Sequence, residues 1–499
     1  MTALADHAAP PGAPRARMML QRARWAATAF AAFDRERTQR VVEAVAGVAY
    51  QNAQRFAELA VEESGMGVVE HKRRKNEACS RGLLERYGAR DFAGVQVDAA
   101  AKIVSVPKPA GVVLALTPST NPVATVYFKV LLGLMTRNAV VVSPHPLARR
   151  CCAEAVHLLA EAAVAAGAPD GCLQVVEEPT IPLIEALMAD DGVDVIVATG
   201  GTAVVRAAYR SGNPSLGVGP GNVPALVDAT ADVAAAARCL TESKAFDNSV
   251  LCTNESVAIV EERVADAFAR ELERHGAHVL NAEEADRARA AFYPEGHIET
   301  KLAGKDAATL ARAADIRVPA GTRVLVAPFE LVVPEEPLAL EKLFPLLGLV
   351  RVPDAPRGIA AARALLRIGG GGHSAVIHSR DPRTILAYGA AVSVLRVTVN
   401  APGSTGAAGL DTHLPPSMTI GTGFFGRSSL TENLQPDHLM QWTRLAYGVD
   451  EPLDDFTGLE PWTAQPAPAP AAAPAEPAAG LSRDELRALI LDELKELVR

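Results

Sequence analysis

The pattern of apolar and polar positions changes twice along the chain. Residues 16 to about 60 are rich in Ala, Arg, Glu and Leu with few Gly or Pro, which predicts two or three helices. From 103 to 228, short β-branched runs alternate with helical stretches, and these runs have the sequences GVVLALTP, AVVVSPHP, LQVVEE, VDVIVATG and PALVD. This alternation predicts βαβ units and a doubly wound parallel sheet.

A second mixed segment extends from about residue 231 to residue 427. It contains apolar runs of the kind found in buried strands, with the sequences SVAIV, RVLVAPF and SAVIHS. At 499 residues the chain is too long for one compact core. We therefore expect an α/β protein with a Rossmann-type lobe, a second α/β lobe and a cleft between them.

The C-terminal part of the chain has a different composition. Residues 463–480 are almost entirely Pro and Ala, which cannot bury a core and which form an extended, semi-rigid spacer. Residues 481–499 repeat Leu and Ile at helical spacing, and Ser482 with Glu485 forms a capping box. The sequence thus predicts an amphipathic helix on a tether, beyond the folded body of the protein.

The charge pattern argues against two classes of partner. The formal net charge is -9 and the basic residues are scattered, so we expect neither nucleic acid nor an anionic membrane as partner. The N-terminus lacks the apolar core of a signal peptide, and no apolar run reaches the roughly 18 residues of a membrane span. The six cysteines form no CxxC pair, which favours the reducing cytoplasm and predicts no metal site.

One cysteine lies where a thiol can face the cleft. Cys252 stands in the segment KAFDNSVLCTNES, between a helical stretch at 231–245 and the strand SVAIV. Taken alone, a single cysteine is more often an inert buried residue than a nucleophile. Its position at a junction between helix and strand nevertheless makes it the first candidate for covalent chemistry.

Further candidates follow the predicted strands of the first lobe. Asn121, in TPSTNP, lies at the edge where open parallel sheets bind ligands. An Asn there is usually a helix cap, but its amide N–H is also able to donate to an oxyanion. The Gly-rich turns at 198–202 and 217–222 do not match GxGxxG, yet a turn that opens a helix can hold a pyrophosphate.

Together these segments carry a resemblance to a known family. They have the sequences VEESGMG, TPSTNP, SPHP, TGG, GVGPGNVPALVD, AFDNSVLCTNES, EKLFP, GHSAVIHSRD and GRSSLTENLQPDHL, in this order. Their order and spacing are similar to those of the aldehyde dehydrogenase superfamily, and in detail to its CoA-acylating branch. Within that branch, the chain resembles the propionaldehyde and acetaldehyde dehydrogenases of bacterial microcompartments. The similarity extends from about residue 16 to residue 450 and implies an aldehyde dehydrogenase-like fold.

The resemblance assigns roles to individual residues. Cys252 matches the nucleophile, and Asn121 with the backbone N–H of Cys252 matches the oxyanion hole. Glu341 matches the carboxylate that holds the nicotinamide ribose, although without this context it reads as an exposed helical Glu. The residues implied to bind the cofactor are Thr117, Ser143, His145, Gly200, Gly201, Thr202, Gly219 and Glu341.

The resemblance also divides the chain into segments. We expect a disordered N-terminus at 1–15, a cofactor-binding domain at 16–228 and a catalytic domain at 229–430. A C-terminal return and oligomerisation segment follows at 431–462, before the linker at 463–480 and the helix at 481–499. The family implies a homo-oligomer, either a dimer or a tetramer.

One difference from the hydrolytic branch indicates the reaction. Hydrolytic relatives carry a general-base Glu upstream of the nucleophile, and the matching position here is taken to be Gly217. General-base help typically contributes about 10²–10⁴-fold, so attack by water on an acyl-enzyme is expected to be slow. The resemblance therefore implies that a short-chain aldehyde is oxidised with NAD and that coenzyme A takes the acyl group.

Several alternatives stay open at this point. A hydrolytic or semialdehyde dehydrogenase of the same fold would release a free acid, and a catalytically silent scaffold would use only the tethered helix. Ser143 is neither a carboxylate that would bind the 2′-hydroxyl of NAD nor an Arg that would bind the 2′-phosphate of NADP. The expectation of NAD as the cofactor therefore comes from the resemblance alone, and NADP is not excluded. His373 reads as a structural histidine, with proton transfer to or from thiols as the alternative.

The tethered helix resembles the encapsulation peptides that direct enzymes into bacterial microcompartments. Those peptides are also short amphipathic helices joined to a cargo enzyme by a linker rich in Pro, Ala or Gly. A lone helix of this size is marginal in water, so its Leu/Ile stripe is expected to seek a groove on a shell protein. The alternative is that 481–499 packs on the enzyme's own surface or on a second subunit.

Overall fold

The computed structural model describes residues 12–457 and residue 459. The chain separates into two units, Met1–Asp454 and Asp455–Arg499, and the first contains every described helix and strand. The predicted linker at 463–480 and the predicted helix at 481–499 lie outside the described residues. None of the described helices is both long and apolar enough to cross a membrane.

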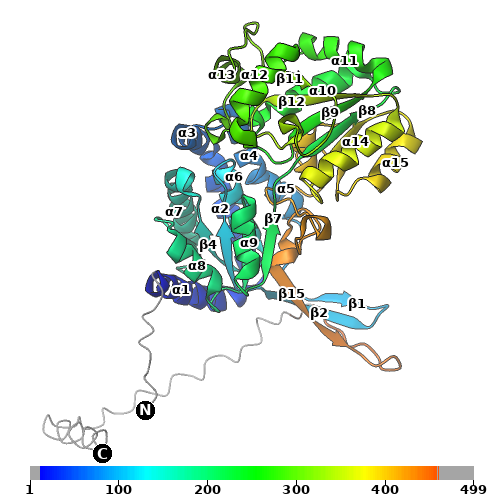
Figure 1. The fold of residues 1–499 in the computed structure, drawn as a ribbon. Helices are drawn as coiled ribbons and strands as arrows, with labels where there is room; N and C mark the ends of the chain where they lie inside the picture. Colours follow the sequence, from blue (N-terminus) through cyan, green and yellow to red (C-terminus); the bar gives the residue numbers. More distant parts are fainter. Residues whose placement is uncertain (1–11, 458, 460–499) are drawn as a thin grey trace, which may run out of the picture. The chain divides into compact units, whose positions relative to one another are not determined.

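A five-stranded parallel sheet forms the first lobe, in the order β5-β4-β3-β6-β7 (Figure 1). The chain enters at the central strand β3, builds outward to β5, and then returns to build the other half, so the sheet is doubly wound as predicted. Its strands are nearly continuous apolar runs because helices cover both faces. Their bounds are β3 Val112–Leu116, β4 Ala139–Ser143, β5 Leu173–Val175, β6 Val195–Thr199 and β7 Ser215–Val218.

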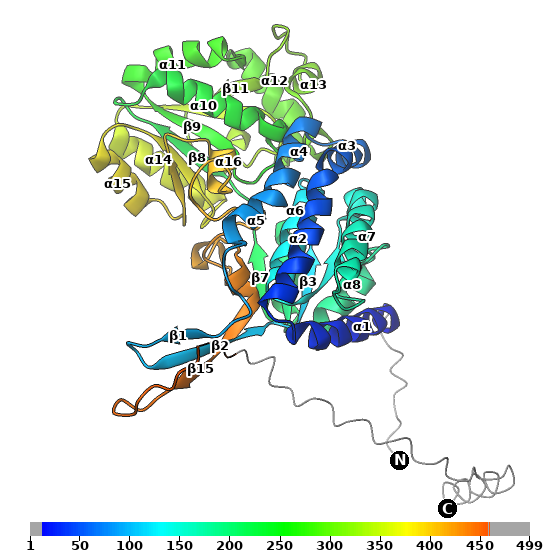
Figure 2. The same ribbon diagram turned by 180° about the vertical axis from the view of Figure 1, so that it is seen from behind.

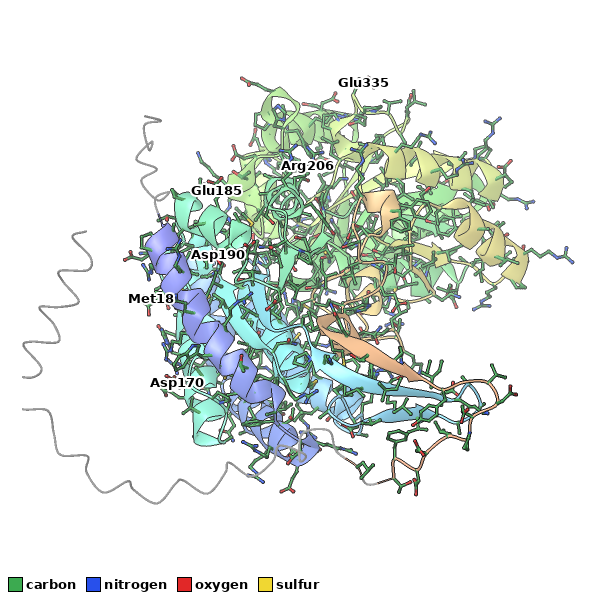
Figure 3. All side chains as sticks on the ribbon, turned by 90° about the horizontal axis from the view of Figure 1, so that it is seen from below. Met18, Asp170, Glu185, Asp190, Arg206 and Glu335 are labelled. Atoms are coloured by element: carbon green, nitrogen blue, oxygen red, sulfur yellow. The ribbon has the colours of Figure 1, made fainter. Side chains whose placement is uncertain are left out.

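Two helical layers cover this sheet. One contains α2, α3, α6 and α7, and the other contains α1, α8 and α9. Figure 3 shows α1 along the outside of the lobe with Met18 on its outer side, and α1 packs against α8. The helix bounds are α1 Ala13–Ala31, α2 Arg35–Gln51, α3 Ala53–Ser64, α4 Val69–Ala78, α5 Arg81–Tyr87, α6 Pro122–Met135, α7 Arg149–Ala165, α8 Ile181–Ala189 and α9 Thr202–Arg210. The prediction of disorder to residue 15 is therefore too long, since α1 begins at Ala13.

A seven-stranded parallel sheet forms the second lobe, in the order β10-β11-β12-β9-β8-β13-β14. Helices α10 and α11 cover one face, and α12 to α15 cover the other. The strand bounds are β8 Val223–Val227, β9 Glu255–Glu261, β10 Ala277–Val279, β11 Val324–Pro328, β12 Leu346–Val352, β13 Ala375–His378 and β14 Val397–Val399. The helix bounds are α10 Val233–Ala245, α11 Glu262–Arg274, α12 Ala282–Phe292, α13 Ala307–Ala313, α14 Ala355–Ile368, α15 Pro382–Ala391 and α16 Gly403–Ala407.

Two predicted domain boundaries are wrong. The run PALVD, expected in the first sheet, is β8 and lies near the middle of the second sheet, so the chain changes lobe at 219–222 and not at 228. Within the predicted catalytic domain, residues between 408 and 430 pack into the core of the first lobe through Ala408, Met418 and Leu430. Hydrophobic periodicity identifies a strand but carries no information about which sheet the strand joins.

A third, antiparallel sheet extends away from both lobes (Figure 2). It consists of β1 Gln96–Asp98, β2 Ile103–Pro109 and β15 Met440–Ala446. The pairing of β15 with β2 carries the chain from 440 back to the segment that precedes the first lobe. β15 forms one edge of this sheet.

Candidate functional site

A cavity of about 600 Å³ lies where the two large sheets face each other. From the first lobe, residues at the carboxyl ends of strands line it, with Thr117 after β3, Ser143 at the end of β4 and Gly200 after β6. From the second lobe, residues before the amino ends of strands line it, with Cys252 before β9 and Glu341 before β12. Doubly wound sheets bind ligands at the carboxyl ends of their strands. Here the segment that carries Cys252 faces this edge of the first sheet across the cavity.

The structure brings most of the predicted site residues into this one cavity. Those that line it are Thr117, Asn121, Ser143, His145, Gly200, Gly201, Gly219, Cys252 and Glu341. Two predicted residues are not part of the lining. Thr202 is the exposed first residue of α9, and His373 is completely buried.

Cys252 is partly exposed at the floor of the cavity. Its enclosure and, to a smaller extent, the negative charge of Glu341 raise the pKa of the thiol to about 12, although the nearby Arg396 acts in the opposite direction. The thiol is consequently protonated at neutral pH. Nucleophilic attack by Cys252 therefore requires a group that accepts its proton.

Glu341 is the acidic group whose charge acts on the thiol of Cys252. Enclosure raises the pKa of its carboxyl group to about 7, although the backbone N–H of Gly221, at 2.9 Å from Oε1, and the buried Lys244 and Lys342 lower it. A carboxyl group with a pKa near neutrality accepts and releases protons readily at physiological pH. The predicted role of Glu341 in holding the ribose of a cofactor is compatible with proton exchange by the same carboxyl group.

Asn121 occupies the N-cap position of α6, but its side chain does not cap the helix. Its amide oxygen accepts a hydrogen bond from the ammonium group of Lys75. Its amide nitrogen donates to the carbonyl oxygen of Val250 at 3.2 Å and to Oγ1 of Thr120 at 3.3 Å. Asn121 therefore stands at the helix cap without capping α6 through its side chain, and its amide N–H faces the segment that leads to Cys252.

His373 lies within the core of the second lobe. Its Nδ1 is 2.9 Å from Oγ of Ser374, and its Nε2 has no hydrogen-bond partner among the described residues. Burial lowers the pKa of the imidazole to about 3, and the positive charge of Arg396 contributes to this shift. His373 is therefore a buried, neutral residue outside the cavity lining, which favours the structural interpretation over proton transfer.

The position assigned to the missing general base requires a correction. Gly217 is not part of the cavity lining, and a Cβ built on it would stand 2.7 Å from Cγ1 of Val205 and 2.8 Å from Cε2 of Tyr209. The next residue, Val218, lines the cavity, because successive residues of a β-strand point to opposite faces. The residue that stands on the cavity side of β7 is therefore a valine, which has no acid–base chemistry.

The glycine turns leave room for a dinucleotide. A Cβ built on Gly201 or on Gly219 would meet no atom within 4 Å, so both turns border open space. Gly201 immediately precedes α9, whose N-terminal N–H groups and dipole favour phosphate. Helix α8 contributes Glu185 to the cavity lining, and Figure 3 labels this residue together with Arg206 of α9. Among the described residues, no group of three or more His, Cys, Asp or Glu is arranged to hold a metal ion.

Several buried charged residues give no recognisable signal in the sequence. Asp247 stood in a quoted motif without a role, and Lys72 and Lys75 lie on α4 in a run of charged residues that reads as an exposed surface. Lys129 on α6 is also buried, and its Nζ donates to the carbonyl oxygens of Leu116 and Val197. A spacing of three residues between Lys72 and Lys75 is the one signal that places two of them on the same face of a helix.

Comparison with known proteins identifies relatives of similar sequence. The model of the aldehyde dehydrogenase family matches residues 7–293. The bifunctional aldehyde-alcohol dehydrogenase of Escherichia coli K12 is 34% identical over 428 residues, which are 85% of this chain and 48% of that protein. The chain thus spans about half the length of this relative. The acetylating succinate-semialdehyde dehydrogenase of Clostridium kluyveri is 33% identical over 431 residues, which are 86% of this chain and 95% of that protein.

Solved structures agree with the sequence comparison. An acetylating aldehyde dehydrogenase from Geobacillus thermoglucosidasius superposes with a TM-score of 0.86 at 35% identity and covers 88% of this chain and 98% of its own. A propionaldehyde dehydrogenase from the fucose utilisation bacterial microcompartment of Clostridium phytofermentans has a TM-score of 0.79 at 26% identity. The match covers 87% of this chain and 97% of that enzyme. A propionaldehyde dehydrogenase of Rhodopseudomonas palustris with bound propionyl-CoA has a TM-score of 0.78 at 26% identity. The match covers 87% of this chain and 94% of that enzyme. With the thiol, the amide and the glycine turns assembled in one cavity between two α/β lobes, the chain belongs to the aldehyde dehydrogenase family.

Proposed function

We propose that this protein oxidises a short-chain aldehyde to an acyl-CoA with NAD and coenzyme A, through a thioester on Cys252. The observation that carries the proposal is the composition of one cavity. Cys252, Asn121 and Glu341 line it together, and Val218 stands on the cavity side of β7, where an acid–base residue would be needed to activate water. Named relatives that transfer an acyl group to CoA support the same assignment.

The first half of the reaction uses the groups around Cys252. Glu341 accepts the proton of the thiol, and the thiolate adds to the aldehyde carbon to form a thiohemiacetal. The N–H of Asn121 and the backbone N–H of Cys252 donate to the oxyanion, a type of stabilisation worth several kcal/mol in acyl-transfer enzymes. NAD, when bound, accepts the hydride and thereby leaves a thioester on Cys252. Thr117, Ser143, His145, Gly200, Gly201, Thr202, Gly219 and Glu341 are the residues proposed to hold it.

The second half transfers the acyl group. The thiol of coenzyme A loses its proton, attacks the thioester carbonyl and displaces Cys252 as the leaving thiolate, which regains a proton. Because no carboxylate extends from β7 into the cavity, hydrolysis of the thioester lacks a general base on that side. The acyl group therefore persists long enough for the thiol to arrive.

Apolar residues of the lining support one kind of aldehyde. Val250, Leu343 and Met418 line the same cavity as Cys252. Apolar walls favour an uncharged aliphatic aldehyde over one that carries a carboxylate or sulfonate, because a buried charge needs a partner. We propose a substrate such as acetaldehyde or propionaldehyde.

A single assay tests the proposed reaction. NADH formation is measured with propionaldehyde in the presence and absence of coenzyme A, and again with NADP. We expect sustained turnover only with coenzyme A, and Cys252→Ala should lose it while unfolding at an unchanged temperature. Equal turnover without coenzyme A, with release of a free acid, would identify the hydrolytic alternative. Full activity of Cys252→Ala would exclude the thioester route altogether.

We also propose that the protein is cargo of a bacterial microcompartment, delivered from the cytoplasm by residues 481–499. The support is the amphipathic pattern of this segment behind a Pro/Ala spacer, together with the structural similarity to a microcompartment enzyme. Deletion of 463–499 should leave turnover nearly unchanged and abolish co-purification with shell proteins, and fusion of 481–499 to a fluorescent protein should confer it. Loss of turnover on deletion would show that the segment belongs to the enzyme's own fold.

The antiparallel sheet supports a homo-oligomer. Among the described residues β15 is an edge strand of seven residues, and such an edge offers unpaired backbone groups to a second copy. We propose a dimer or a tetramer that uses 431–462. Light scattering of the protein truncated after residue 439 should then show a smaller particle than the full chain forms.

A further inference from the structure

The segment just before the nucleophile has a strained backbone. Asp247, Asn248 and Ser249 have φ angles of 51°, 50° and 63°, so three successive residues with side chains adopt the left-handed conformation. Left-handed conformations of this kind persist only where the surrounding structure holds them. The segment connects α10 to Cys252, so whatever holds it also determines where the thiol lies.

Helix α4 and the residue before it hold this segment through Asp247. The completely buried carboxylate accepts hydrogen bonds from the backbone N–H of Val68 at 2.7 Å and from Nζ of Lys72 at 3.1 Å, and it also binds Nζ of Lys75. In the opposite direction, the backbone N–H of Asp247 donates to Nδ1 of His71 at 2.9 Å. The nucleophile segment is thus tied to an element nearly 180 residues earlier in the chain.

The approach of Asp247 requires a glycine in the turn before α4. Gly67 has a φ of 84°, and a Cβ at this position would overlap the carboxylate of Asp247. Asn248 adds a second connection, because its Nδ2 donates to the carbonyl oxygen of Gly304 at 2.9 Å. These contacts give a structural role to the motif VEESGMG at 61–67, whose sequence alone indicates only a family resemblance.

Lys75 makes a further contact that Lys72 does not make. Its ammonium group donates to Oδ1 of Asn121 as well as to Asp247, whereas Lys72 donates to the backbone carbonyl oxygen of Thr120 at 2.8 Å. An ammonium group has only hydrogens to offer, so the amide of Asn121 must present its oxygen to Lys75. The N–H groups of the amide are thereby directed the other way, toward the carbonyl oxygen of Val250 and Oγ1 of Thr120, two residues that line the cavity with Asn121.

The charges of the cluster are consistent with this arrangement at neutral pH. Burial by itself raises the pKa of the Asp247 carboxyl, but Lys72 and Lys75 hold it below its ordinary value. Burial lowers the pKa of the Lys75 ammonium to about 8, and the carboxylate of Asp247 limits the fall. Asp247 is therefore ionised and Lys75 is mainly protonated.

We propose that Lys75, held by Asp247, is a positioning residue of the reaction, which directs the amide N–H of Asn121 toward the oxyanion that forms at Cys252. The inference rests on the proposed function, in which Asn121 is the oxyanion donor. Lys75 does not line the cavity and acts only through the orientation of Asn121. Lys72 is its matched control, since it is an equally buried lysine on the same helix and binds the same carboxylate.

The test is a pair of double-mutant cycles in the full-length enzyme. Steady-state kcat and KM for propionaldehyde, with coenzyme A and NAD, are measured for Lys75→Met, Lys72→Met, Asn121→Ala and the two double variants. Loss of the oxyanion donor in Asn121→Ala should lower kcat about 10²–10³-fold. Misorientation of the amide in Lys75→Met should lower kcat about 10- to 100-fold with KM changed by less than about threefold.

The double variants separate positioning from a general loss of structure. If Lys75 acts through Asn121, then Lys75→Met on the Asn121→Ala background should cause no further loss of kcat beyond about threefold. Any loss in Lys72→Met should instead multiply with that of Asn121→Ala. Losses of Lys75→Met and Asn121→Ala that multiply would overturn the positioning role, whereas an unchanged kcat in Asn121→Ala alone would overturn the proposed oxyanion donor itself.

A second variant keeps the test decisive if Lys75→Met does not fold. Lys75→Gln retains a polar group at the buried position and is shorter by one methylene group, so it withdraws the donor from Asn121 with a smaller perturbation. Thermal unfolding and alkylation of Cys252 by iodoacetamide report whether the fold and the thiol are intact. With both intact, Lys75→Gln should reproduce the loss of kcat and its absence on the Asn121→Ala background, and a wild-type kcat would refute the proposal.

Discussion

The backbone of Gly221 packs directly against the backbone of Cys252. A Cβ built on this residue would stand 1.9 Å from the carbonyl oxygen of Cys252 and 2.9 Å from its carbonyl carbon, and the φ of Gly221 is not positive, so the constraint is steric alone. Real Cβ atoms stay at least 3.0 Å from such an atom. Gly221→Ala must therefore move the backbone of Cys252 or its own loop by about 1 Å.

A shift of this size should be far more harmful to catalysis than to folding. Misplacement of a reacting group by about 1 Å can lower the rate about 10²-fold, whereas overpacking costs about 1–3 kcal/mol of stability. The backbone N–H of Gly221 also donates to Glu341 at 2.9 Å, so the same shift disturbs the proton acceptor. We expect a folded Gly221→Ala variant with kcat reduced about 10²-fold.

The assay combines steady-state kinetics with the rate of alkylation of Cys252 by iodoacetamide. Gly47→Ala is the control, because a Cβ there meets no atom within 4 Å and its position inside α2 predicts a gain of up to about 1 kcal/mol in stability. A Gly221→Ala variant with kcat and alkylation rate within about threefold of the wild type would show that the contact does not position the nucleophile.

Three further outcomes follow from the structure. Asn121→Asp retains an acceptor for Lys75 but has no N–H to donate, so kcat should fall about 10²–10³-fold while the unfolding temperature stays unchanged in calorimetry. Val218→Glu should produce CoA-independent acid, measured by chromatography, whereas Gly217→Glu should fail to fold because its Cβ would overlap Val205 and Tyr209. Burial lowers the pKa of His378 to about 4, below the unfolded value of about 6.5, so stability is lost as the pH falls through this window. Between pH 7 and pH 5 the protonation of His378 should lower the free energy of unfolding by about 2 kcal/mol. In urea unfolding, the free energy of His378→Gln should therefore fall by about 2 kcal/mol less over this pH range than that of the wild type.

Hydrophobic periodicity predicted the secondary structure well because each sheet is covered on both faces. The strands of the first lobe are continuous apolar runs for that reason, and four of its five strands were recognised as members of one doubly wound sheet. The fifth predicted strand, PALVD, was a strand of the other sheet. The hydrophobic pattern of a strand reflects how buried the strand is. Strands of both sheets are buried on both faces, so the pattern does not show which sheet a strand joins.

The site was predictable where the chemistry lies in a side chain next to a recognisable turn. Cys252, Asn121 and Glu341 stand in motifs that the sequence presents directly, and the tertiary structure places all three on one cavity. Gly217 and Val218 differ by one position, and only the direction of the strand determined which of the two faces the cavity. A one-residue change reverses the face of a strand, so spacing alone could not decide this.

The orientation of Asn121 depended entirely on tertiary structure. Lys75 lies 46 residues before Asn121, and Asp247 lies 172 residues after Lys75, so no local pattern connects the three. In the sequence, α4 reads as an exposed charged helix, because the periodicity of polar residues does not distinguish a lysine in water from a lysine buried against a carboxylate. The sequence by itself determined the elements, the family resemblance and the reacting groups, and packing of distant segments alone decided which charges are buried and how the amide is turned.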